Sequence, residues 1–264
     1  SVGVGSIGNM HTQPETYEKV LGQIESDHLL VSTKYCSGDF YSWLPINPTL
    51  YTGNHRRLVE FQAKREFEGF GSFPNFVGPL HQSALQSILE RNQKLEGAWV
   101  WTQYGGPLRA GPMIIYPFHG FNVINDVNVY TTGELLKNPY LNLDQLTAQW
   151  IEGYFGSDSL LVANLTRVLY DSYEVMKKGL YISEYARYEV HALGLEPPPM
   201  MWIFEWDILG ASSAALSNIY HISRSSFQAV VDEGFEAVKG AIALKDLLLE
   251  SRELVKTHTA DYEQ

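Results

Sequence analysis

Cysteine is nearly absent from this sequence: Cys36 is the only one among 264 residues. A single cysteine excludes an intramolecular disulfide framework and a zinc site built from cysteines. The 8 histidines form neither an HxH nor an HExxH cluster, and the glycine-rich stretches lack the spacing of dinucleotide and P-loop fingerprints. We therefore predict no bound metal and no cofactor.

Positive charge and long apolar runs are also scarce. The chain has 19 Lys and Arg against 30 Asp and Glu, a net charge of −11, and no cluster of basic residues. Because phosphate binding needs clustered Lys and Arg, we predict no nucleic-acid partner. No apolar run reaches the ~18 residues typical of a membrane-spanning helix, so no membrane partner is predicted either.

Aromatic side chains, in contrast, are abundant. They make up 13% of the residues and include 6 Trp and 16 Tyr. With 45% hydrophobic and 19% charged residues, the composition is that of a globular protein with a sizeable core. Aromatic rings fill such cores, and they also stack on the faces of sugars, so the composition leaves both uses open.

The first ten residues, SVGVGSIGNM, have neither an initiator Met nor the basic-then-apolar build of a signal peptide. Residues 2–7 alternate apolar and small side chains, as a buried strand does. We therefore expect the chain to be a piece of a longer protein. The sequence does not indicate its compartment.

The first half of the chain alternates strand patterns with helix patterns. Strands are predicted at residues 29–33, 57–62 and 97–102, with a weaker one at 121–125, and helices are predicted from residue 14 and at residues 83–92. Strands separated by helices are typical of a parallel sheet or barrel.

Beyond about residue 126 the pattern becomes helical. Helices are predicted at residues 134–137, 143–155, 160–177, 184–192 and 227–256. In the last helix, the side chains expected on the inner face are Val231, Phe235, Val238, Ile242 and Leu249. Several helix faces in this region are apolar, which burial within the chain or a homodimer through the helical region would explain.

Four or five strands are too few to close a (β/α)8 barrel, which needs eight strands and eight helices in ~250 residues. We therefore predict an α/β protein in which residues 1–130 form the second part of a (β/α)8 TIM-type barrel, followed by an all-helical domain at residues 131–264. An open sheet is the alternative for the first part.

Charged side chains follow two of the predicted strands. Lys34 and Asp39 come after the first of these strands, and Glu60 and Glu66 lie in and after the next. Glycoside hydrolysis uses one carboxylic acid to protonate the leaving oxygen and a second carboxylate to activate water or to attack directly. Asp39 and Glu66 are candidates for such a pair. Ordinary loop acids paired with Arg65 would produce the same pattern.

The stretches that carry these residues resemble a known family. VSTKYCSGDFYSWLPINPTL followed by RRLVEFQAKREFEGFG is similar to the catalytic core of the α-glucuronidases of glycoside hydrolase family 67. In that family a strand ends in a Lys with an Asp five residues on, and the next strand carries Glu-Phe-Gln with a Glu shortly after it. Those positions are here Lys34, Asp39, residues 60–62 and Glu66. The downstream NVYTTGELLKNPYLNLDQLTAQWIEGYFG resembles the family's passage into its helical domain, so the likeness covers about residues 29–195.

The resemblance implies an inverting glycoside hydrolase that removes an α-linked uronic acid or related sugar from an oligosaccharide. Asp39 and Glu66 would hold and deprotonate the attacking water. Lys34 would bind the carboxylate of the sugar, for which an ammonium is suited. The general acid of the family is a Glu on an earlier strand, outside this chain. The residues predicted to bind substrate are Lys34, Arg65, Trp43 and Glu60.

The sequence departs from the family at three places. The family has a uronate-binding Arg on the strand that is here SVGVGSIGN, its Gln-Glu-Tyr is here Arg65-Glu66-Phe67, and GAWVWTQYGG has no counterpart. Arg65 would supply the missing cation. Two other functions fit the same residues: a non-catalytic carbohydrate-binding protein, and a polysaccharide lyase in which Lys34 or Tyr41 abstracts a proton next to a uronate.

Overall fold

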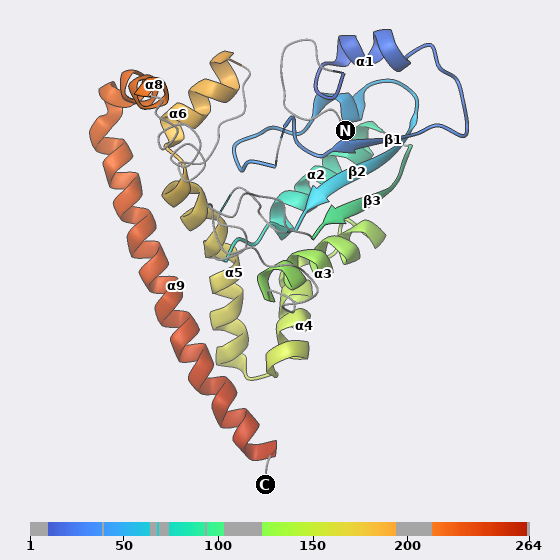
Figure 1. Ribbon diagram of the computed structural model, residues 1–264. Helices are drawn as coiled ribbons and strands as arrows, with labels where there is room; N and C mark the ends of the chain where they lie inside the picture. The colour runs from blue at the N-terminus through green and yellow to red at the C-terminus, as the bar shows by residue number, and fades with distance from the viewer. Residues whose placement is uncertain are drawn as a thin grey trace.

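The computed structural model describes residues 10–38, 40–63, 68, 74–92, 94–102, 123–193 and 213–262 of the chain. Within them, three parallel strands and a larger number of helices form a mixed α/β protein (Figure 1). The α/β prediction is confirmed at this level. The predicted strand at residues 2–7 lies outside the described residues.

The sheet has the order β1-β2-β3, so strands that are consecutive in the chain are neighbours. Its strands are β1 (Leu30–Lys34), β2 (Arg56–Gln62) and β3 (Leu95–Trp101). The strands predicted at residues 29–33, 57–62 and 97–102 are therefore confirmed, within two residues at each end. Because the pairing is parallel, their carboxyl ends meet at one edge of the sheet.

Short helical segments connect the strands. The helix α1 (Pro14–Leu21) precedes β1, the 3-10 turn η1 (Pro48–Tyr51) lies between β1 and β2, and α2 (Gly78–Arg91) lies between β2 and β3. The start of α2 comes five residues before the predicted one. The reason is Pro79, which stands in the first turn, where proline's missing N–H costs nothing.

The remaining described chain is helical. Its elements are α3 (Val123–Lys137), α4 (Leu143–Phe155), α5 (Ser159–Leu180), α6 (Ser183–Tyr188), η3 (Glu189–Leu193), α8 (Ser213–Ser223), η5 (Arg224–Ser226) and α9 (Phe227–Tyr262). The starts of α4 and α5 follow from their capping residues, because the Asn142 and Asp158 side chains accept hydrogen bonds from backbone N–H groups of the first turns. None of the described helices is both long and apolar enough to cross a membrane.

Two predictions near residue 126 need correction or comment. The weak strand at 121–125 is wrong for residues 123–125, which begin α3, and residues 121–122 lie outside the described residues. The predicted domain boundary at residue 130 falls inside the same helix. A Val-Ile-Asn run suits a strand locally, but here it belongs to a helix that packs on α2 and α4.

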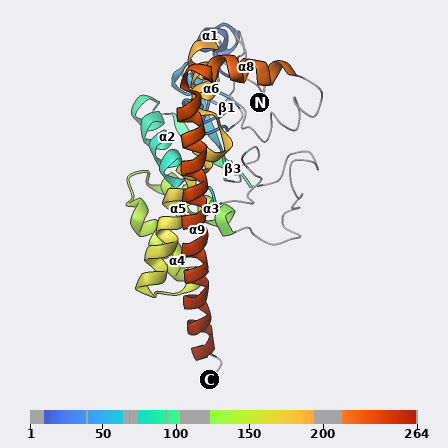
Figure 2. The ribbon, with the colours of Figure 1, turned by 90° about the vertical axis from the view of Figure 1, so that its left-hand side faces the viewer.

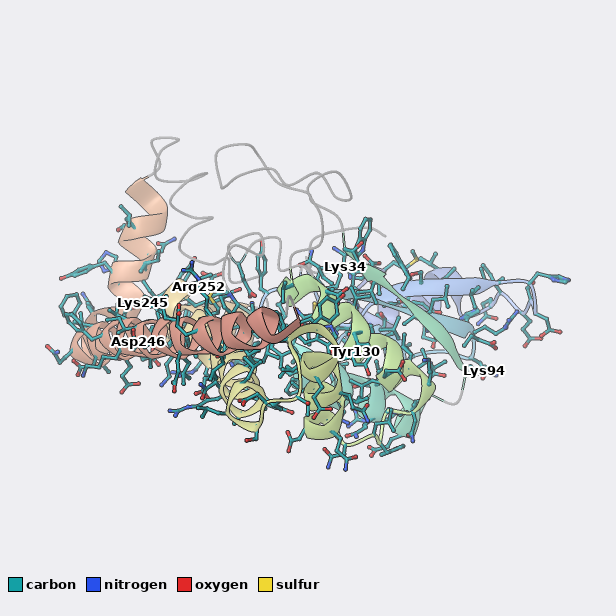
Figure 3. The ribbon with its side chains drawn as sticks, turned by 90° about the horizontal axis from the view of Figure 1, so that it is seen from below. Lys34, Lys94, Tyr130, Lys245, Asp246 and Arg252 are labelled. Atoms are coloured by element: carbon teal, nitrogen blue, oxygen red, sulfur yellow. The ribbon has the colours of Figure 1, made fainter. Side chains whose placement is uncertain are left out.

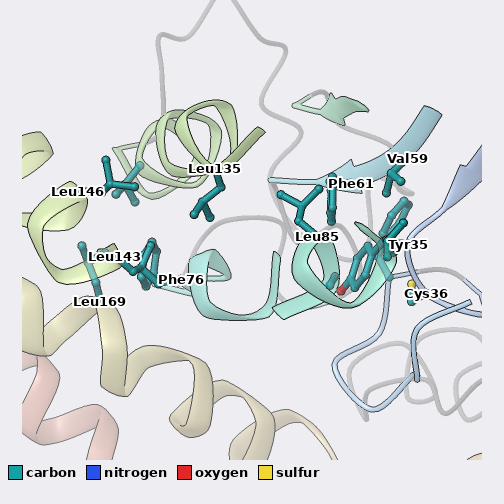
Figure 4. Close-up of a cluster of buried hydrophobic side chains, with 14 of the residues drawn as sticks. Tyr35, Cys36, Val59, Phe61, Phe76, Leu85, Leu135, Leu143, Leu146 and Leu169 are labelled. Atoms are coloured by element: carbon teal, nitrogen blue, oxygen red, sulfur yellow. The ribbon is translucent and has the colours of Figure 1, made fainter. Parts of the chain in front are cut away.

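One core cluster joins the sheet to the helices. It contains Val59 and Phe61 of β2, Leu85 of α2, Trp150 of α4 and Leu169 of α5. Figure 4 shows the cluster continuing from the sheet side to the helix side. The helical region therefore packs in one core with β2, near whose carboxyl end predicted site residues lie.

The last helix, α9, runs beside α5 along the length of the molecule (Figures 1 and 2). The prediction of its inner face is wrong: Phe235 is 62% exposed and Val238 56%. Ala237 and Leu244 are buried instead. The helices approach closely at Gly240, where a Cβ would lie 2.6 Å from Val175 Cγ2, so small residues occupy the packed face.

Candidate functional site

The two faces of the sheet differ in chemistry. Side chains alternate between faces along a strand, and register partners on neighbouring strands share a face. We call one side the packed face; its residues are Thr33, Arg57, Val59, Phe61, Ala98 and Val100. We call the other side the polar face; its residues are Ser32, Lys34, Leu58, Glu60, Gln62, Gly97, Trp99 and Trp101.

The packed face is covered by α2. The ring of Phe61 lies 4.4 Å from the ring of His81 and 5.2 Å from that of Tyr35, measured between centroids. The His81 Nδ1 is 2.8 Å from Thr132 Oγ1 of α3, so this imidazole is tied into the core. Its surroundings indicate a structural role.

Arg57 lies at the amino-terminal end of the packed face and is fully buried. Its guanidinium stacks 4.3 Å from the ring of Tyr17 and donates to the Thr52 carbonyl and, at 3.4 Å, to Thr33 Oγ1. Burial lowers the pKa of Arg57 and raises the pKa of Tyr17. Because it lies at the opposite end of β2 from the strand's carboxyl terminus, Arg57 links α1 to the sheet and does not join the candidate site.

The polar face brings two predicted site residues together. Lys34 and Glu60 are register partners on β1 and β2, near the carboxyl ends of both strands. Both are buried, with 7% and 1% of their surfaces exposed. Figure 3 shows Lys34 toward one end of the sheet and Lys94 toward the other. Two buried residues of opposite charge are therefore in register on this face.

Two tryptophans complete the polar face. Trp101 Nε1 donates to Glu60 Oε1, and Trp99 Nε1 donates to Ser32 Oγ at 2.7 Å, so the Trp99 indole extends from β3 over β2 to β1. The two rings are 4.7 Å apart between centroids, and Trp99 remains 38% exposed. Trp-x-Trp within a strand places both indoles on one face. The sequence contained this signal in GAWVWT, although neither residue was among the predicted site residues.

The residue after Asp39 has an unusual backbone. Phe40 has a φ of 36°, in the left-handed region that bulky residues rarely adopt. Its buried ring lies 5.2 Å from Lys34 Nζ and 5.9 Å from the ring of Tyr35. Such a conformation costs about 1–3 kcal/mol and persists where surrounding packing fixes it, which happens most often at functional sites.

A buried carboxylate braces the loops beyond the strand ends. Glu68 Oε1 accepts hydrogen bonds from the Ser42 backbone N–H at 2.9 Å, from Ser42 Oγ at 2.7 Å and from the Tyr181 hydroxyl. Its Oε2 accepts from Asn75 Nδ2 at 2.8 Å. Glu68 therefore connects the loop after β1, the loop after β2 and the end of α5. No sequence pattern distinguished it from the neighbouring acids.

Two helices support the same loops. Asn128 of α3 donates from Nδ2 to the carbonyls of Ala63 and Asn75, at 2.9 and 3.0 Å, and accepts from the Val77 N–H at 3.0 Å. Tyr173 of α5 donates to the Ser42 carbonyl at 3.2 Å. The helical region thus fixes the chain on both sides of the segment that contains Arg65 and Glu66.

Trp43, predicted to bind substrate, packs against the helical region. Lys177 Nζ of α5 lies 4.3 Å from its ring, and the Arg187 guanidinium of α6 lies 5.2 Å from it. Its buried Nε1 has no hydrogen-bond partner among the described residues. These contacts are cation–π interactions that link the loop after β1 to α5 and α6. Its role in substrate binding stays a prediction.

Asp39, Arg65 and Glu66 lie outside the described residues, so their predicted roles also stay predictions. In the described part of the chain, no group of three or more His, Cys, Asp or Glu side chains is placed to hold a metal ion. A cavity of about 370 Å³ is lined by apolar side chains of α3, α4, α5 and α9, with Arg252 among its lining residues, and none of these residues belongs to the sheet. The cavity is therefore separate from the polar face.

No protein-family model matches the sequence, and a search of curated proteins finds no match to it.

Proposed function

We propose that this chain belongs to an inverting glycoside hydrolase, similar to the α-glucuronidases of family 67, that removes an α-linked uronic acid from an oligosaccharide. The observation that carries the proposal is the polar face, where Lys34 and Glu60 are register partners beside Trp99 and Trp101. An ammonium suits a sugar carboxylate, a carboxylate accepts sugar hydroxyls, and an indole stacks on the apolar side of a sugar ring.

In this proposal the three strands are part of a (β/α)8 barrel. Consecutive parallel neighbours with a helix on one side are what a barrel segment requires, and α2 covers only the packed face. The polar face then points into the barrel. Active sites of such barrels lie at the carboxyl ends of the strands, which is where Lys34 ends β1 and Gln62 ends β2.

In this proposal the catalytic residues lie in the loops that follow those strand ends. Asp39 and Glu66 hold a water molecule, one of them takes its proton, and the water oxygen attacks the anomeric carbon. The bond to the leaving oxygen breaks, and a general acid outside this chain protonates that oxygen. Glu68 and Asn128 support the proposal because they fix the backbone flanking Glu66.

A paired-substrate assay tests the role of Lys34. The complete enzyme is assayed on an α-linked glucuronosyl oligosaccharide and on the matched α-glucosyl oligosaccharide, which has a hydroxymethyl in place of the carboxylate. Lys34→Met should lower kcat/KM for the first by about tenfold to a hundredfold, the equivalent of one charge-assisted hydrogen bond, and leave the second unchanged. Equal losses on both substrates would contradict uronate recognition by Lys34.

The catalytic assignment needs separate variants. Asp39→Asn and Glu66→Gln should each lower kcat by about 10²–10⁴ while KM changes little, because both residues act on the water. The first-formed sugar, followed by NMR, should have the inverted β configuration. Activity close to that of the unchanged enzyme in either variant would remove that residue from the mechanism. A product with a new ultraviolet-absorbing double bond would identify a lyase.

A second candidate function is non-catalytic carbohydrate binding. The partly exposed Trp99 favours it, because a stacking platform needs no catalytic carboxylate. Glucuronic acid should quench tryptophan fluorescence in the unchanged protein and less so in Trp99→Phe. Quenching without any product release, in a protein that also contains the upstream strands, would favour this function over hydrolysis.

A further inference from the structure

The helix α9 has two apolar faces, and only one of them has a partner in the described chain. Ala237, Leu244 and Ser251 are buried on the side that packs against α5. An ion pair of 2.7 Å between Lys178 of α5 and Glu236 fixes the same contact. The α5 side is therefore fully explained by packing within the chain.

The opposite side of α9 carries a row of large apolar residues, which we call the outer stripe. Its members are Phe227, Val231, Phe235, Val238, Ile242 and Leu249. Five of the six are at least 50% exposed, and Val231 is partly exposed. Figure 2 looks onto α9 and shows no described helix in front of it. An exposed apolar row of this kind marks an interaction surface.

The spacing of the outer stripe specifies a helix as its partner. From Val231 to Ile242 the apolar residues recur at intervals of four, three and four, which is the a/d pattern of a coiled coil. From Phe227 to Leu249 the helix rises about 33 Å, long enough for three heptads. The residues facing α5 occupy other heptad positions, so both contacts can be made at once.

We propose that the outer stripe binds the same stripe of a second copy of the chain, with the two α9 helices antiparallel. In one register, Phe235 packs against the partner's Val238, and Val231 packs against the partner's Ile242. The two-fold axis produces each contact twice. This extends the predicted homodimer through the helical region to a defined pairing, and it does not depend on the proposed enzymatic activity.

The residues flanking the outer stripe complement themselves in that register. Asp232 lies beside the partner's Lys239, opposite in charge. On the other flank Gly234 lies beside the partner's Ala241, two small residues that allow close approach. An unrelated helix would have no reason to match both pairs. A second copy is therefore the occupant that the sequence of α9 favours.

A parallel arrangement fits less well. Parallel in-register helices would place Lys245 against the partner's Lys245 within the seam. Figure 3 shows Lys245 and Arg252 along α9. In the antiparallel register Lys245 instead meets the partner's Gln228, an uncharged residue. Like-charge repulsion thus selects the antiparallel form.

Sedimentation of the full chain tests the proposal. The unchanged protein should be a dimer, and Phe235→Glu should raise the dimer dissociation constant by at least about a hundredfold, as expected for a central apolar anchor. Circular dichroism should show unchanged helicity, because Phe235 is 62% exposed. The matched control is Glu250→Gln, at an exposed position outside the seam, which should dimerise normally.

Charge reversal tests the register. Asp232→Lys and Lys239→Asp should each weaken self-association by about tenfold, because each places like charges across both copies of the pair. A mixture of the two single variants should form a heterodimer as tight as the unchanged dimer. A monomer at every accessible concentration, a dimer that survives Phe235→Glu, or a mixture no tighter than either single variant would overturn the proposal.

Discussion

The two faces of one small sheet show how the same strands serve stability on one side and binding chemistry on the other. On the packed face, Val59 and Phe61 are 0% exposed and lie under α2, where apolar burial favours folding. On the polar face, Lys34 and Glu60 are also buried, and burial of charged groups opposes folding. Unlike the buried Arg57 and Glu68, whose contacts tie elements of the fold together, Lys34 and Glu60 lie at the strand ends where the proposed site is.

The first prediction tests the difference in stability between the packed face and the polar face. Phe61→Ala should lower the free energy of unfolding by about 3–5 kcal/mol, because it removes a fully buried ring and leaves a cavity against His81. Trp99→Ala on the polar face should lower it by only about 1–2 kcal/mol, because part of that indole is already solvent-exposed. Urea denaturation of both variants measures the difference. Equal losses would mean that the two faces do not differ as described.

The second prediction concerns the bracing carboxylate. Glu68→Gln should lower the free energy of unfolding by about 2–3 kcal/mol, because an amide places an N–H group among donors that need an acceptor. The control is Glu90→Gln, an exposed carboxylate on α2, where little change is expected. Denaturation of both variants decides the point. A loss no larger than that of the control would show that the Glu68 network does not hold the loops.

The third prediction concerns a substitution of buried residues that should not lower the free energy of unfolding. Glu60→Gln keeps the shape of the side chain and an acceptor for Trp101 Nε1 while removing a buried charge. When it is combined with Lys34→Met, so that neither charge is left buried alone, unfolding free energy should stay within about 1 kcal/mol of the unchanged value or rise, while activity on the uronic-acid substrate falls. Parallel denaturation and kinetic assays test both halves. A large loss of stability would place Glu60 with the structural residues.

The sequence predicted the strands and several helices because their periodicity is local. The bounds of α4 were predicted without error, since Leu146, Trp150 and Ile151 repeat at helical spacing after the Asn142 cap. Lys34 and Glu60 were both among the predicted site residues, but their register partnership was not predicted. Local patterns of this kind predict whether a segment is a helix or a strand and which of its faces is apolar.

The sequence could not predict contacts that depend on which elements meet. Glu68 is one acid among several after β2, and it becomes a buried acceptor because Ser42, Asn75 and Tyr181 all approach it from other parts of the chain. The predicted inner face of α9 was wrong for the same reason. The larger apolar residues form the outer stripe, while Ala237 and Gly240 pack against α5. Hydrophobicity suggested which face is apolar, but close helix packing selected the face with smaller side chains.

The smallest expected effect on stability comes from an ion pair that is exposed to solvent. Lys178 and Glu236 form an exposed ion pair between α5 and α9, in which the hydrogen bond lowers the pKa of Glu236 and raises the pKa of Lys178. A lowered carboxyl pKa gives stability that is present above its unfolded value and is lost as pH falls through the folded value. The raised pKa of Lys178 gives stability that is lost only as pH rises through the folded value, so the pair contributes across neutral pH.

Glu236→Gln should therefore cause a slight loss of stability at pH 7 that disappears below about pH 4 and in high salt, because solvent and ions screen an exposed pair. Thermal unfolding of both proteins across pH, at low and high salt, measures the difference. An effect as large as that of Glu68→Gln would contradict the principle behind the comparison of the two faces, which is that the same charge matters far more once water is excluded from it.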